Sequence, residues 1–129
     1  MTRRQHPEDD LHVTVAQFLG VEKNLALPED AVWTTIEHGG QRGKREAGRL
    51  KAKGLKPGFP DILIVYRGLL ICIELKAKYR SLSPKQEAMH EHLALAGALP
   101  FVAETVEEVE LFLRGCGVPL RASTGTRAA

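Results

Sequence analysis

The chain has 129 residues, of which 43% are hydrophobic and 26% are charged, and this composition is typical of one globular domain with a single core. Its formal net charge of +2 is too small to indicate a class of partner, so charge has to be examined in local clusters. No apolar run is long enough to cross a membrane, and the N-terminal MTRRQHPEDD lacks the apolar core of a secretory signal, so we expect a soluble cytoplasmic protein.

The first expected element is a helix that begins at Pro7 and ends near Gly20. Proline suits the first helical turn, and the acidic residues 8–10 favour the positive end of the helix dipole. The apolar residues of this segment recur at helical spacing and form one stripe, which consists of Leu11, Val15, Phe18 and Leu19. Residues 31–36 (AVWTTI) are rich in β-branched and aromatic residues, which predicts a short strand.

Residues 42–56 (RGKREAGRLKAKGLK), called the basic segment below, hold seven basic residues and one acidic residue. Few of these residues could anchor a core, so we expect a loop. The basic residues are Arg42, Lys44, Arg45, Arg49, Lys51, Lys53 and Lys56. Such a cluster could neutralise several phosphates and give DNA affinity that falls with salt. A solvated surface loop without a partner is the alternative.

Two apolar runs, 61–66 (DILIVY) and 69–75 (LLICIEL), are separated by Arg67 and Gly68, which predicts a β-hairpin. Both runs are almost continuously apolar. We therefore expect the hairpin at the centre of a sheet, with both of its faces covered by helices.

The C-terminal third predicts a helix, a strand and a second helix. Ser83, Pro84 and Gln86 match the capped start of a helix, which Gly97 would end. Residues 99–104 (LPFVAE) predict a strand, and residues 105–115 predict the second capped helix. The whole pattern predicts an α/β fold, in which a small mixed sheet has the hairpin at its centre and helices on its faces. One domain would span residues 1–120, and the tail 121–129, which lacks apolar anchors, is expected to be disordered.

Charged residues within the hairpin are the candidates for function. If Arg67 and Gly68 form a two-residue turn, Asp61 faces Glu74 across the strand pair. Two opposed carboxylates repel each other unless a positive group lies between them, and Lys76 points to the same face. A metal ion would remove the repulsion, and an ion-paired triad of these side chains is the alternative.

The other possible metal ligands are weaker candidates. His90 and His92 are two residues apart on a predicted helix and do not share a face. Cys72 and Cys116 lack the spacing of zinc ligands, so we expect reduced thiols.

Pro60 and Asp61, followed by Glu74, Leu75 and Lys76, resemble the PD-(D/E)XK nuclease signature. RLKAKGLKPGFPDILIV, CIELKAKYRSLSPKQ, LALAGA and a closing capped helix together resemble the VRR-NUC branch, a family of small phage and bacterial proteins. The likeness covers about residues 7–115. It implies a restriction-endonuclease-like core and metal-dependent hydrolysis of DNA.

The resemblance also implies roles for the charged residues. In that family the motif aspartate and glutamate, here Asp61 and Glu74, bind a divalent cation with the main-chain carbonyl of the intervening residue, here Leu75. Such oxygen ligands suit Mg²⁺ or Mn²⁺. The motif lysine, Lys76, would orient or help to deprotonate the attacking water.

Two further positions follow from the same resemblance. An acidic residue on the first helix commonly completes the site, and Glu8 is the best match, with Asp9 and Asp10 as alternatives. All three could instead stabilise the helix N-terminus. Gln86 matches the glutamine of the family, and its position in a capping box is compatible with that role.

Relatives usually have Asn before a Gly pair where this chain has His38 in EHGGQRG, so His38 and Gln41 are candidates for DNA contact. Stand-alone members resemble junction resolvases and tend to form homodimers, which implies branched DNA as the substrate. A DNA-binding or recombination accessory module that kept the fold but does not cut is the alternative function.

Overall fold

The computed structural model describes residues 6–36 and 43–125, and the following statements concern these residues. They contain a four-stranded sheet of order β1-β2-β3-β4. Its first two pairs are antiparallel, and its last pair is parallel. The strands are β1 (Ala31–Thr35), β2 (Ile62–Tyr66), β3 (Leu69–Leu75) and β4 (Leu99–Ala103). The predicted mixed sheet with a central hairpin is therefore confirmed.

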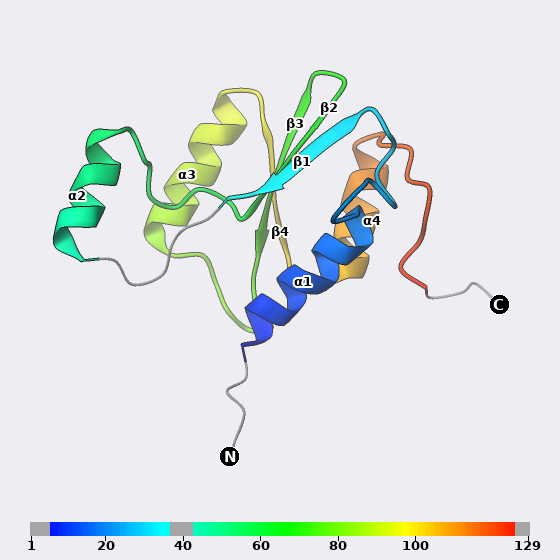
Figure 1. Ribbon diagram of the computed structural model, residues 1–129, viewed down its shortest axis with the longest axis horizontal. Coiled ribbons are helices and arrows are strands. Elements are labelled where there is room, and N and C mark those ends of the chain that lie inside the picture. Colours follow the sequence, from blue (N-terminus) through cyan, green and yellow to red (C-terminus); the bar gives the residue numbers. More distant parts are fainter. Residues whose placement is uncertain (1–5, 37–42, 126–129) are drawn as a thin grey trace, which may run out of the picture.

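Helices lie on both sides of this sheet (Figure 1). They are α1 (Pro7–Leu19), α2 (Lys44–Ala52), α3 (Pro84–Leu95) and α4 (Val106–Gly115). One side of the sheet carries α1 and α4, whereas α3 lies on the other side and α2 lies farthest from the sheet (Figure 1). No helix among the described residues has the length and apolar character that crossing a membrane requires.

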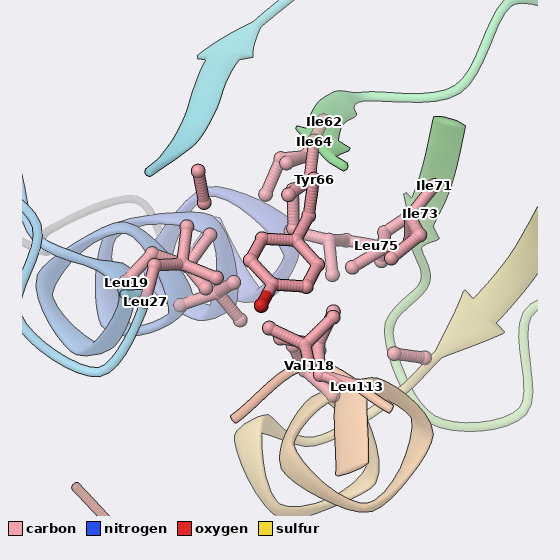
Figure 2. Packing of buried hydrophobic residues seen from close by; sticks show 14 residues of the cluster. Leu19, Leu27, Ile62, Ile64, Tyr66, Ile71, Ile73, Leu75, Leu113 and Val118 are labelled. Atoms are coloured by element: carbon pink, nitrogen blue, oxygen red, sulfur yellow. The ribbon is translucent and has the colours of Figure 1, made fainter. Parts of the chain in front are cut away.

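The main core lies between the sheet and the α1–α4 side. Figure 2 shows Ile62, Ile64 and Tyr66 pointing from β2 toward side chains of α1 and α4. Leu19 on α1 and Leu113 on α4 are fully buried there. Because alternate strand residues point to opposite faces, the odd-numbered residues of β3, such as Ile73, join this core, while Glu74 points to the α3 side.

The prediction that helices cover both faces of the hairpin is wrong for β2. Its burial alternates, and Val65 is 42% exposed beside Val32 of β1, which is 70% exposed. The reason is the position of α3, which packs against β4 at the opposite edge of the sheet. Burial of both faces is confined to β3, where Cys72 and Ile73 are both fully buried.

The hairpin turn fixes the predicted register. Arg67 and Gly68 both have positive φ, at 43° and 85°, and such two-residue turns match the twist of the flanking strands. Tyr66 pairs with Leu69, as predicted. The guanidinium Nε of Arg67 donates to Asp30 Oδ2 at 2.7 Å and holds the turn against the segment before β1.

The basic segment does not form the predicted loop, because residues 44–52 are the helix α2. Its residues are mostly good helix formers, and an ion pair between Arg49 and Glu46 spans one turn at 2.7 Å. No residue of α2 is buried. The loop was expected because few residues of the segment could anchor a core, and α2 forms without burying any residue.

The ends of α3 and α4 follow the predicted capping signals. In α3 the Ser83 side chain accepts from Gln86 N, and the Gln86 side chain accepts from Ser83 N. In α4 the Thr105 side chain accepts from Glu108 N at 3.1 Å, and the Glu108 carboxylate accepts from Glu104 N at 2.7 Å.

Residues 121–125, within the tail that was expected to be disordered, make hydrogen bonds to the rest of the fold. Arg121 N donates to Ala26 O at 2.8 Å, and Thr124 N donates to Glu110 Oε1 at 2.9 Å. Hydrogen bonds attach this segment to the fold where the sequence offers no apolar anchor.

Candidate active site

The predicted acidic pair meets at the end of the hairpin opposite its turn. Ile62 pairs with Ile73 at the last rung of the β2–β3 ladder, and the same register places Asp61 opposite Glu74. Lys76 follows β3, and its Nζ lies 3.8 Å from Glu74 Oε2. The structure therefore brings Asp61, Glu74 and Lys76 together as the hairpin pattern predicted.

Glu74 is the one charged residue that is buried within residues 6–36 and 43–125, at 3% exposure. Gln86 Nε2 donates to its Oε2 at 3.3 Å. Its Oε1 is buried and has no hydrogen-bond partner in the described part of the chain. Because an unsatisfied buried oxygen destabilises a fold, this carboxylate is a feature that stability does not explain.

The surroundings of Glu74 oppose its ionisation. Burial raises the pKa of Glu74 to about 8, and the negative charge of Asp61 acts in the same direction. Glu8 adds a smaller effect of the same sign, whereas the ammonium of Lys76 lowers the pKa. Three carboxylates thus share one ammonium group, which leaves the cluster short of positive charge.

Main-chain contacts hold the acidic pair in place. Leu75 N donates to Asp61 Oδ2 at 2.8 Å, across the two strands. Gln86 links the site to α3, because its Nε2 donates to Glu74 and its Oε1 accepts from Ser83 N at 2.9 Å. The capping box and the contact with Glu74 therefore coexist in one side chain.

A cavity of about 310 Å³ contains this cluster. Its lining residues come from α1, the two strand ends and α3, and they are Glu8, Asp9, His12, Asp61, Glu74, Leu75, Lys76 and Gln86. Glu8 is half-buried and faces the cavity, while Asp10 is exposed and does not line it. Among the three acidic residues of α1, Glu8 is thus the best placed to act with Asp61 and Glu74.

Two histidines near the site were not predicted. His12 lines the cavity, and its Nε2 lies 3.0 Å from Thr35 Oγ1. His90 Nε2 is buried without a partner among the described residues; burial lowers the pKa of His90, and the Asp61 and Lys76 charges act on it in opposite directions. His12 lies four residues after Glu8, and His90 lies four residues after Gln86. Residues four apart share a face of a helix, so this spacing is the sequence feature that could have predicted both histidines near the site.

The described basic residues of the basic segment do not line the cavity. Lys44, Arg45, Arg49, Lys51, Lys53 and Lys56 are all exposed on α2 and the residues that follow it. His38, Gln41 and Arg42 lie outside the described residues.

The oxygen atoms of the site suit a hydrated hard cation. Within residues 6–36 and 43–125, no group of three or more His, Cys, Asp or Glu side chains is placed to hold a metal ion. Mg²⁺ and Mn²⁺ need fewer than three such side chains, because they are commonly bound through one or two carboxylates and retain several waters. Asp61 and Glu74, with the unpartnered Oε1, fit that requirement.

Two solved structures resemble this fold. One is described as a VRR_NUC domain protein; it is 24% identical, the match covers 88% of this chain and 89% of that chain, and the TM-score is 0.65. The other is described as a VRR_NUC domain, with 18% identity, coverage of 85% and 97%, and a TM-score of 0.54. No family model and no curated protein matches the chain. The fold of this chain is that of VRR_NUC domain proteins, which confirms the resemblance at the level of the fold.

Proposed function

We propose that this protein is a metal-dependent endonuclease that hydrolyses phosphodiester bonds in DNA. The observation that carries the proposal is the buried Glu74 carboxylate, which faces Asp61 and keeps one oxygen without a partner among the described residues. The nuclease fold of the similar structures supports the same conclusion.

Asp61 and Glu74 would hold Mg²⁺ or Mn²⁺, with the main chain of Leu75 and with Glu8 as a further acidic group. When bound, such a cation lowers the pKa of water and stabilises charge on a phosphate. Gln86 fixes the orientation of Glu74 by donating to Oε2. The site is thus pre-formed by backbone and helix-cap contacts, which is how active sites avoid reorganisation during reaction.

Lys76 is the candidate for proton handling. Its side chain is 13% exposed and lies beside Glu74, which keeps the ammonium inside the cavity. As an ammonium it can orient the attacking water or balance charge on the phosphate as the bond to the leaving oxygen breaks. It could take the proton of that water only after losing one of its own to solvent, as the neutral amine.

The exposed basic residues of α2 and residues 53–56 would contact the DNA backbone. Neutralising Lys51 and Lys53 together should reduce the slope of log Kd against log salt by about two, because each phosphate contact contributes roughly one unit. An unchanged slope would remove this segment from the interface. Arg49 is a poorer choice for this test, since it already pairs with Glu46.

The proposal includes action on branched DNA by a homodimer, because a twofold pair would present two sites to a junction. Light scattering of the purified protein, alone and with a four-way junction, tests the pairing. A monomer in both states would exclude it.

The deciding experiment compares wild type with Lys76→Ala and Asp61→Asn on linear, nicked and four-way DNA, in Mg²⁺, Mn²⁺ or chelator. We expect cleavage by wild type in either metal, none in chelator, and retained DNA binding by Lys76→Ala. Binding by wild type without any cleavage would favour the alternative of a DNA-binding module on the same fold.

A further inference from the structure

A strained tyrosine follows the site. Residues 77–80 form a turn in which Arg80 N donates to Ala77 O at 3.0 Å. Tyr79 is the third residue of this turn and has a φ of 69°. That position selects Gly or Asn when φ is positive, and an aromatic residue there is an outlier that costs conformational energy.

Packing does not compensate for this strain. Tyr79 is 90% exposed, which is the largest exposure among the large hydrophobic residues of the described chain. Its backbone is nevertheless fixed, because Tyr79 N donates to Glu104 Oε2 at 3.3 Å. The Lys78 Nζ lies 5.1 Å from the centroid of the ring. The fold therefore holds an aromatic ring in solvent with a cation beside it.

The location of the ring connects it to the site. Tyr79 is three residues beyond Lys76, and the same turn borders a hollow of about 520 Å³ next to α1. Lys78 and Arg80 line this hollow, and Glu8 and Asp9 line both it and the site cavity. A nucleic-acid strand with a phosphate at Lys76 could thus continue past two basic side chains to the ring.

We propose that Tyr79 stacks on a nucleobase next to the phosphate held at the site, with Lys78 and Arg80 contacting the adjoining backbone. This inference rests on the proposed nuclease function. Every base has a face on which an aromatic ring can stack, but a paired base inside a duplex has both faces covered by its neighbours. The substrate class is therefore DNA with an unpaired or unstacked nucleotide beside the cut.

Binding in chelator separates this inference from catalysis. The probe is a gapped duplex with 2-aminopurine in the gap, titrated with wild type, Tyr79→Phe and Tyr79→Ala. We expect Tyr79→Phe to bind as wild type does, and Tyr79→Ala to bind about ten-fold more weakly and to lose the change in 2-aminopurine fluorescence. An abasic site in place of the 2-aminopurine should abolish the difference in affinity.

Leu95→Ala is the matched control, because Leu95 is 86% exposed but lies at the end of α3. It should bind as wild type does. Equal affinity of Tyr79→Ala and wild type for the gapped probe would overturn the stacking proposal and leave the nuclease proposal intact. If the protein shows the stacking signal but never cuts DNA, the stacking proposal stands and the nuclease proposal is overturned. If wild type binds no DNA, both proposals are overturned.

Tyr79→Asn tests whether the residue instead serves the fold. Asn tolerates positive φ, so this variant should unfold at a higher temperature than wild type while it binds the gapped probe more weakly. A lower unfolding temperature, or a change in oligomeric state with unchanged DNA affinity, would assign Tyr79 to folding or self-association and overturn the proposal.

Discussion

The two ends of the β2–β3 hairpin differ in where their charged side chains lie: they are exposed at the turn and buried or partly buried at the opposite end. At the turn, Arg67 and Asp30 form an ion pair whose side chains are 73% and 45% exposed. At the other end, Glu74 is buried beside Asp61, with the Lys76 ammonium 3.8 Å away. An exposed ion pair changes the stability of the fold little, whereas two buried like charges destabilise it. This difference supports the proposal that the acidic end binds a ligand, because ion pairing within the fold accounts for the charges at the turn end only.

Asp61→Asn should have the largest effect on activity. It removes one of the two carboxylates proposed to hold the cation but keeps a side-chain oxygen that can accept from Leu75 N. We expect cleavage to fall by at least about 10²-fold, with little loss of stability because the repulsion with Glu74 is relieved. The measurement is the initial cleavage rate in Mn²⁺, together with urea unfolding in chelator. Activity near that of wild type would remove Asp61 from the reaction.

Gly58→Ala should have the next largest effect, through the position of the acidic end. Gly58 has a φ of +82°, and an added Cβ would lie 2.5 Å from the carbonyl oxygen of Lys85 and 3.0 Å from Gln86 N. The chain before Asp61 thus packs closely on the first turn of α3. We expect a loss of about 1–3 kcal/mol in the free energy of unfolding and weaker cleavage.

Gly54→Ala is the control for Gly58→Ala. Gly54 also has a positive φ, at +100°, but an added Cβ would meet nothing within 4 Å. It reports backbone strain alone, about 1 kcal/mol. If the two variants lose the same stability in urea, the close approach to α3 has no energetic role.

Much of the acidic end could be predicted from the sequence, because a two-residue turn fixes which residues face each other in both strands. Asp61 and Glu74 follow from that count alone. His90 could not be found in the same way, since its approach to the site depends on how α3 packs on the sheet. The exposure of Val65 could not be predicted for the same reason. The sequence shows that a strand is apolar, but it does not show which helix will cover the strand.

The helix of the basic segment was missed for a different reason. Hydrophobic periodicity identifies helices that bury one face, and α2 buries none. Tyr79 could not be identified from the sequence, because no periodic pattern surrounds an aromatic residue in a polar loop. Its positive φ becomes visible when the backbone is known.

The acidic end should respond to pH, while the turn end should not. Because the pKa of Glu74 rises from 4.5 to about 8 on folding, the folded protein binds this proton more tightly than the unfolded chain. The resulting stability is present below pH 4.5 and is lost as pH rises through about 8. In chelator, the free energy of unfolding should therefore fall between pH 7 and pH 9.

Glu74→Gln should flatten this decrease, because its side chain does not titrate. The comparison is made above pH 7, since burial lowers the pKa of His90 from 6.5 and its titration acts in the opposite direction at lower pH. Urea unfolding at several pH values measures both proteins. Parallel curves for wild type and Glu74→Gln would show that Glu74 ionises normally.

Asp30→Asn at the turn end should have the smallest effect. It weakens the exposed ion pair with Arg67, but the positive φ of Arg67 and Gly68 and the β2–β3 ladder keep the register. Because solvent screens such a pair, we expect the urea midpoint to stay within experimental error and the cleavage rate to match wild type. A marked loss of cleavage in Asp30→Asn would mean that the turn sets the geometry of the acidic end, and the two ends would then have to be treated as one unit.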